Sequence, residues 1–311
     1  MPSQLSRRRF VISLSSLAAA SVLPERLDSA LARPSKFAQS QMRFGYAAIT
    51  WGGNDLQAIK DISEVGFRGI QIRSNVLKDF GDKPKALAEL LKQHKLTFVA
   101  LSGGGPRNDA YVAAEEIATQ VKHATFLRDA GGLYLQMTDS ARPKDRTPGS
   151  KDFKALGRLL TDIGKRTSDM GIPVAYHNHM RSLGEGPDDV DALMDAADPK
   201  YVKLLLDVAH YSQGGGDPVK AIKKHHDRIL FLHIKDVESI GSGPDSTNNY
   251  RFVELGRGRV DLPAVFAALA QVKFRGWAIV ELDSVPDKTR TPTDSAIISR
   301  KYLEEKLGMK I

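Results

Sequence analysis

Four apolar runs in the second half of the chain are each followed by histidines or acidic residues. The polar groups are Tyr176-His177-Asn178-His179, Asp207-Val208-Ala209-His210, His233-Ile234-Lys235-Asp236 and Glu281-Leu282-Asp283. Imidazole and carboxylate ligands suit Mn, Co, Zn or Mg rather than a soft metal. One such residue at the end of a strand is usually structural, but four consecutive groups of this kind predict a shared metal site.

The absence of cysteine narrows the chemistry that these groups can perform. A thiolate metal site, a thiol nucleophile and a disulfide framework are all excluded. Each metal ligand is therefore expected to be a histidine, a carboxylate, a neutral oxygen or water. The same histidines are candidate general bases, because free imidazole titrates near neutral pH.

The polar groups need a scaffold that brings the ends of separate strands together. Short apolar runs alternate with longer segments of helical period, which is typical of βα units and a parallel sheet. Eight strands are expected, at residues 43–48, 69–73, 97–101, 132–137, 173–177, 202–207, 229–234 and 277–282. This pattern predicts a closed (β/α)₈ TIM barrel, an α/β fold of about 250 residues.

Two helical segments illustrate the pattern between the strands. Leu56, Ile59, Ile62 and Val65 are expected to bury one face of a helix. A second helix is expected over residues 261–272, where an N-terminal Asp is followed by Pro within the first turn.

An open, doubly wound sheet is the alternative architecture. Such a sheet would carry a G-x-G-x-x-G motif after its first strand to bind a dinucleotide. No such motif follows residues 43–48, and the glycines at 103–105 and 214–216 indicate flexible loops instead. The barrel is therefore preferred, and its active site is expected where the carboxyl ends of the strands meet.

The ordered set of motifs resembles the xylose-isomerase-like barrels of the sugar phosphate isomerase/epimerase superfamily. That superfamily also contains inosose dehydratases, tagatose and psicose epimerases and the endonuclease IV group. The likeness covers the mature chain, and its segments are residues 45–53, 66–70, 176–179, 207–210, 233–236 and 255–258, followed by Glu281.

The resemblance implies that Asp207, His233 and Glu281 are metal ligands from the sixth, seventh and eighth strands. It leaves the fourth ligand open. Epimerases of the superfamily place a Glu where this chain has His177, whereas inosose dehydratases draw a carboxylate from the fourth strand, where this chain has Gln136. Gln136, His177 or the nearby His179 could therefore complete the ligand set, with manganese favoured over cobalt, zinc or magnesium.

The presence of His177 in place of the epimerases' Glu also affects which reaction is expected. The epimerases use two carboxylates on opposite faces of a sugar, and Glu281 is the only one of the pair present. A lyase or dehydratase acting on a keto-sugar or keto-glycoside is therefore favoured, with His177 or His179 removing the proton next to the carbonyl. His210 or Lys235 would assist the departing oxygen, although Lys235 could instead hold a substrate oxygen or only pair with neighbouring carboxylates.

Substrate contacts and competing functions follow from the same motifs. Trp51 is expected to stack on a sugar ring, and Asn178 and Arg257 are assigned to substrate binding.

The alternative functions are a ketose isomerase or epimerase with related chemistry, and an exported barrel that binds carbohydrate without converting it. The endonuclease function is excluded by the resemblance, because the second and third strands end without the additional histidines that it requires.

The N-terminus predicts export. Residues 1–32 resemble a twin-arginine signal peptide that ends in an A-x-A cleavage site, residues 33–41 a linker, and residues 42–311 the barrel. The apolar run is shorter than the roughly 20 residues of a membrane span, so a periplasmic or secreted protein without a membrane anchor is expected. Cleavage removes four basic and two acidic side chains and lowers the net charge from +8 to +6. The remaining basic residues are scattered, which disfavours nucleic acid as a partner. A homo-oligomer remains a possible assembly.

Overall fold

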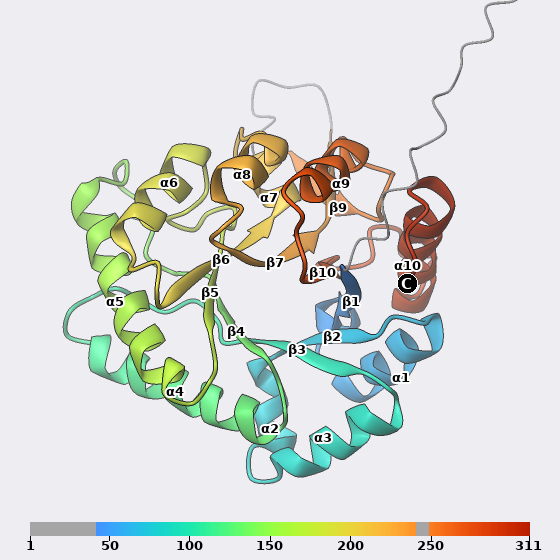
Figure 1. Cartoon of the computed structure of the whole chain (residues 1–311), viewed down its shortest axis with the longest axis horizontal. Coiled ribbons are helices and arrows are strands. Elements are labelled where there is room, and N and C mark those ends of the chain that lie inside the picture. The colour runs from blue at the N-terminus through green and yellow to red at the C-terminus, as the bar shows by residue number, and fades with distance from the viewer. Residues whose placement is uncertain (1–41, 241–248) are drawn as a thin grey trace, which may run out of the picture. The chain divides into compact units, whose positions relative to one another are not determined.

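The computed structural model describes residues 42–240 and 249–311. Eight parallel strands form a closed barrel in the order β1-β10-β7-β6-β5-β4-β3-β2, with helices around it (Figure 1). The strands are β1 (Arg43–Ala47), β2 (Gly69–Arg73), β3 (Thr97–Ser102), β4 (Tyr134–Met137), β5 (Val174–His177), β6 (Val202–Asp207), β7 (Ile229–Ile234) and β10 (Trp277–Val280). The predicted barrel is confirmed, and every predicted strand overlaps an observed one.

The helices occupy the segments between the strands. They are α1 (Asp55–Val65), α2 (Leu77–Phe80), α3 (Pro84–Gln93), α4 (Ala113–Asp129), α5 (Ser150–Ser168), α6 (Pro187–Ala196), α7 (Val208–Gln213), α8 (Pro218–His225), α9 (Leu262–Gln271) and α10 (Pro292–Lys301). The predicted start of α9 is confirmed, because the Asp261 side chain accepts a hydrogen bond from the Ala264 amide at 3.0 Å.

Helix α1 differs from the prediction at one position. Ile59, Ile62 and Val65 are buried, but Leu56 is 59% exposed, so its predicted burial is wrong. Residues three apart fall about 60° short of a full turn on an α-helix, and three such steps carry Leu56 off the buried face. Ala58 takes its place in the core.

A two-stranded antiparallel ribbon was not predicted. It consists of β8 (Asp236–Ser239) and β9 (Tyr250–Val253), which pair in register from Asp236 opposite Val253 to Ser239 opposite Tyr250. The ribbon follows β7 directly. It therefore lies in the connection that leaves the carboxyl end of a barrel strand, where the active site was expected.

The barrel interior is a packed layer directly below these carboxyl ends. Ala175, Leu205, Phe231 and Ile279 belong to one buried apolar cluster. Each lies two residues before one of the polar strand-end residues, and side chains two apart on a strand point to the same side. Side chains alternate along each strand, so the same side that fills the barrel with apolar groups carries the polar residues at its carboxyl end.

The predictions for residues 1–32 and 33–41, a signal peptide and a linker, lie outside the described residues. Among the helices of residues 42–240 and 249–311, none combines the length and the apolar character that a membrane span requires.

Candidate metal centre

Four buried side chains meet at the carboxyl ends of neighbouring strands: His177, Asp207, His233 and Glu281. One ligand atom from each can be chosen so that all four atoms lie within 4.8 Å of one another. The strand register explains the convergence, because Asp207 of β6 pairs with His233 of β7. The Glu281 amide, just beyond β10, donates to the Ile234 carbonyl of β7 at 3.1 Å. We call these four residues the metal cluster.

Three of the four atoms that face each other in the cluster lack a hydrogen-bond partner among the described residues. Nε2 of His177 and Nδ1 of His233 each lie 3.5 Å from Oδ2 of Asp207, and the same Nδ1 lies 3.3 Å from Oε1 of Glu281. Three of these buried atoms, His177 Nε2, Asp207 Oδ2 and His233 Nδ1, have no hydrogen-bond partner within the described part of the chain. Leaving such atoms unsatisfied is costly. A divalent cation would satisfy all three, so the donor set fits the expected metal.

The electrostatics of the cluster also favour a cation. Burial and the neighbouring His233 lower the pKa of His177 to about 4, which keeps its imidazole neutral. Burial opposes charge on His233, but Glu281 and Asp207 outweigh it and raise the pKa of His233 to about 9. Burial likewise opposes ionisation of Asp207 and Glu281, yet neighbouring positive groups hold the pKa of both carboxyls well below their usual range. Two ionised carboxylates therefore remain at the centre.

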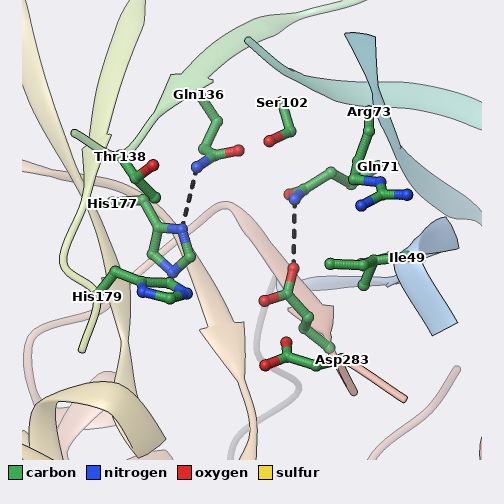
Figure 2. Close-up of a pocket in the computed structure, with 11 residues that line it drawn as sticks. Ile49, Gln71, Arg73, Ser102, Gln136, Thr138, His177, His179 and Asp283 are labelled. Atoms are coloured by element: carbon green, nitrogen blue, oxygen red, sulfur yellow. Dashed lines mark hydrogen bonds between the residues drawn. The ribbon is translucent and has the colours of Figure 1, made fainter. Parts of the chain in front are cut away.

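Two glutamines orient the histidines of the cluster. Nε2–H of His233 donates to the side-chain oxygen of Gln71 at 2.8 Å, so that release of the Nδ1 proton to make room for a cation would leave a lone pair directed at the cluster. The Gln71 side-chain nitrogen lies 3.5 Å from Oε2 of Glu281, a contact drawn in Figure 2. Because such outer partners fix the tautomer and direction of a ligand, Gln71 supports two members of the cluster.

Gln136, a candidate for the fourth ligand, contacts His177 instead. Its side-chain nitrogen lies 3.0 Å from Nδ1 of His177, and its oxygen is buried without a partner among the described residues. A metal at Nε2 of His177 requires the ring proton on Nδ1. A half-turn of the Gln136 amide would let its oxygen accept that proton. His177 therefore directs a ring nitrogen at the cluster, whereas Gln136 contacts the opposite side of the His177 ring.

Asp207 is held by bonds that leave one of its oxygens available. Its Oδ1 accepts from the amides of Ala209 and His210 at 2.9 and 2.8 Å, as the N-cap of α7. Asn178 was expected to contact substrate, but its side chain is fully buried and bonds the backbone N–H and C=O of Asp207 at 2.9 and 3.2 Å. In this structure Asn178 positions Asp207, a member of the cluster.

A cavity of about 140 Å³ opens beside the metal cluster. Its wall includes His177 and Glu281 of the cluster, together with His179 and Asp283 (Figure 2). Nδ1 of His179 lies 2.7 Å from the Met180 carbonyl oxygen, so Nδ1 carries the ring proton. Nε2 of His179 therefore has a lone pair that can accept a proton.

His210 and Lys235 lie behind this cavity. The Lys235 ammonium is fully buried and lies 2.5 Å from Asp283, 3.2 Å from Glu281 and 3.3 Å from Nε2 of His210. The Met180 amide donates to Nδ1 of His210 at 3.1 Å. Burial and then the Lys235 charge hold the pKa of His210 well below its usual value. His210 is therefore neutral, and its two ring nitrogens face two donors, the Met180 amide and the Lys235 ammonium.

Trp51 and Arg257 lie apart from the cavity. The Trp51 indole is buried and donates to Asp61 at 2.8 Å. The Arg257 side chain is 47% exposed and approaches Glu254 at 3.9 Å. Among the described residues that line the cavity beside the metal cluster, neither appears.

Several cavity residues received no predicted role from the sequence. They are Gln71, Arg73, Ser102, Thr138 and Asp283. Gln71 offers a signal, because it is a polar residue in the middle of an apolar strand. The other four follow or end strands, but polar residues are common there, and which of them face a shared cavity depends on the closure of the barrel.

Comparison with known proteins places these features in a family. The family model for the xylose isomerase-like TIM barrel matches residues 59–306. The rhizopine catabolism protein MocC of Rhizobium meliloti is 30% identical, over 79% of this chain and 82% of that protein. An inosose dehydratase of Clostridium tetani is 25% identical, over 88% of this chain and all of that protein. The structure of an IolI protein with a bound zinc atom superposes with a TM-score of 0.72 at 19% identity, covering 85% of this chain and 97% of that one.

Proposed function

The chain belongs to the xylose isomerase-like TIM barrel family, and we propose that it is a divalent-metal-dependent lyase or dehydratase of a keto-sugar or keto-glycoside. The reaction would remove the proton next to the carbonyl and expel the β-oxygen as water or alcohol. The main support for the proposal is the metal cluster. Its buried atoms without hydrogen-bond partners face one another beside a cavity that is also lined by His179. The similarity to an inosose dehydratase supports a dehydration.

The proposed ligands are His177, Asp207, His233 and Glu281. A divalent ion held by them would act as a Lewis acid that stabilises the negative charge developing on the carbonyl oxygen. Manganese is the proposed ion, and cobalt, zinc and magnesium suit the same nitrogen and oxygen donors.

The proposed general base is His179. It lines the cavity beside the cluster, and its Nε2 carries a lone pair because Nδ1 donates to the Met180 carbonyl. His177, the other candidate base, has its Nε2 directed at Asp207 within the cluster. The two histidines of the Tyr176–His179 motif therefore take different roles in this proposal, one as a ligand and one as the base.

Assistance to the departing oxygen is assigned to His210. The Lys235 ammonium lies next to the His210 ring and forms an ion pair with Asp283. His210 lines a second cavity next to the cluster, whereas Lys235 is absent from the described linings of both cavities. Lys235 is therefore proposed as a positioning residue that holds Asp283 and Glu281 through its ion pairs.

Two other functions remain as alternatives. A ketose isomerase or epimerase would share the proton-removal step but would need a second group to return the proton from the opposite face. The resemblance implies that this chain has His177 where the epimerases carry that group as a carboxylate. A carbohydrate-binding barrel without catalysis would not need four ligand atoms directed at one point.

Removal of the metal tests the proposal. Treatment with a strong chelator followed by dialysis is expected to abolish conversion of a keto-sugar, and added Mn²⁺ is expected to restore it. The reason is that the developing negative charge loses its Lewis acid. Conversion would be followed by ultraviolet absorption of the unsaturated product. Unchanged conversion by protein shown by elemental analysis to be free of metal would contradict the proposal.

Export by the twin-arginine route is proposed from residues 1–32 alone. Replacing Arg7 and Arg8 together with Lys is expected to leave the precursor folded and uncleaved in the cytoplasm, because the export machinery reads the arginine pair. Cell fractionation followed by immunoblotting measures the outcome. Normal accumulation of mature protein in the periplasm would show that the motif does not direct export.

A further inference from the structure

A second, larger cavity lies next to the one beside the metal cluster. Its volume is about 530 Å³, and His179 and Asp283 line both cavities. Ligand pockets usually measure about 300–1,000 Å³, so the second cavity falls in that range and the first falls below it. A molecule that reacts beside the cluster could therefore extend past these two residues into the second cavity.

The walls of the second cavity combine an aromatic and apolar part with charged and polar side chains. Tyr250 and Phe252 of β9 lie with ring centroids 5.4 Å apart at 69°. Met180 and Pro286 add apolar surface, and Arg181 is one of two arginines in the lining. Aromatic faces and guanidinium planes both stack well on flat rings. The aromatic part of this wall therefore suits a planar ring.

The aromatic wall adjoins the groups assigned to the departing oxygen. The Phe252 ring lies 4.7 Å from the His210 ring at 66°, and the Lys235 ammonium lies 3.9 Å from the Phe252 centroid. A leaving group in the second cavity would thus keep its oxygen near His210 while its ring packs on Phe252 and Tyr250.

We propose that the second cavity binds the leaving group of a keto-glycoside, and that this group is an aromatic alcohol. The inference rests on the proposed function and narrows its substrate class. His179 would take the proton next to the carbonyl, and the carbon–oxygen bond to the leaving group would break with its electron pair on that oxygen. The oxygen would gain a proton from the His210 side. An unsaturated keto-sugar and a phenol result, with no change in overall oxidation state.

Binding of unreactive glycosides tests this subsite without turnover. Phenyl β-glucoside and methyl β-glucoside lack a keto group, so the proposed elimination does not consume them. In isothermal titration calorimetry, the phenyl compound is expected to bind about tenfold more tightly than the methyl compound, from ring stacking and burial. Tyr250→Ala and Phe252→Leu are each expected to reduce that ratio to within about twofold, with methyl β-glucoside affinity unchanged. Tyr111→Ala is the matched control, because Tyr111 is 84% exposed and outside the described cavity linings.

Three results would overturn the subsite. The first is equal binding of the two glycosides by the unaltered protein, and the second is a phenyl preference that survives both substitutions. The third is tighter binding of cellobiose than of phenyl β-glucoside, which would assign the cavity to a second sugar. A phenyl preference that is lost as expected, in a protein that does not convert keto-glycosides, would support the subsite and contradict the proposed function instead.

Discussion

Replacing Asp207 with Asn is expected to lower divalent-metal affinity by more than about 100-fold, because loss of an outer partner alone commonly costs about 10–100-fold. The amide keeps an oxygen that can still cap α7 through Ala209 and His210. It removes the negative charge from Oδ2, the atom that both His177 and His233 face. The fold should therefore survive while the metal is lost.

Elemental analysis after dialysis measures the metal, and circular dichroism with thermal unfolding checks the fold. His233→Gln and Glu281→Gln are expected to behave in the same way. His225→Gln is the matched control, because His225 is a buried histidine that pairs with Asp191 at 2.8 Å outside the metal cluster. Full metal content in all three cluster variants would show that these residues do not form the metal site.

Replacing His179 with Ala is expected to slow elimination by about 10²–10⁴-fold, the usual contribution of a positioned general base. Metal content should stay close to that of the unaltered protein, because His179 is not a member of the described cluster. His177→Ala is expected to lose both metal and activity. Rates on a keto-sugar, measured beside elemental analysis of the same samples, separate the two roles.

The opposite pattern would reverse the assignment. If His179→Ala lost the metal and His177→Ala kept it, His179 would be the ligand and His177 the base. If both variants kept the metal and the full rate, neither histidine would serve the reaction.

The barrel was predictable because its signals are local and repeated. The eight barrel strands follow from alternating apolar and helical segments, and each of them overlaps its expected range. The failure at Leu56 has a local cause as well, since three-residue spacing does not keep to one helical face. The β8–β9 ribbon gave no comparable signal, because the residues of β8 follow β7 almost without a break.

The candidate site was predictable in part. Asp207, His233 and Glu281 stand at strand ends, and the barrel brings them together with His177. The choice among Gln136, His177 and His179 required coordinates, because it depends on which ring atom faces Asp207 and which faces the cavity.

Other assignments depend on contacts that distant segments make. Gln71 on β2 reaches His233 on β7 across the barrel, and no spacing in the sequence reports such a contact. Asn178 lies in the predicted motif, but its bonds to the Asp207 backbone become visible only in the folded chain. Trp51 turns its indole N–H to Asp61, a residue of α1.

The mass of the product tests the central claim, elimination from a keto-sugar, most directly. The Mn²⁺-loaded protein would be incubated with a keto-sugar or keto-glycoside and the mixture analysed by mass spectrometry. We expect a product lighter than the substrate by the expelled water or alcohol, absorbing in the ultraviolet, or its hydrated successor with the alcohol released. Conversion between two saturated ketoses of identical mass, with no water or alcohol released, would contradict the lyase assignment and favour an epimerase.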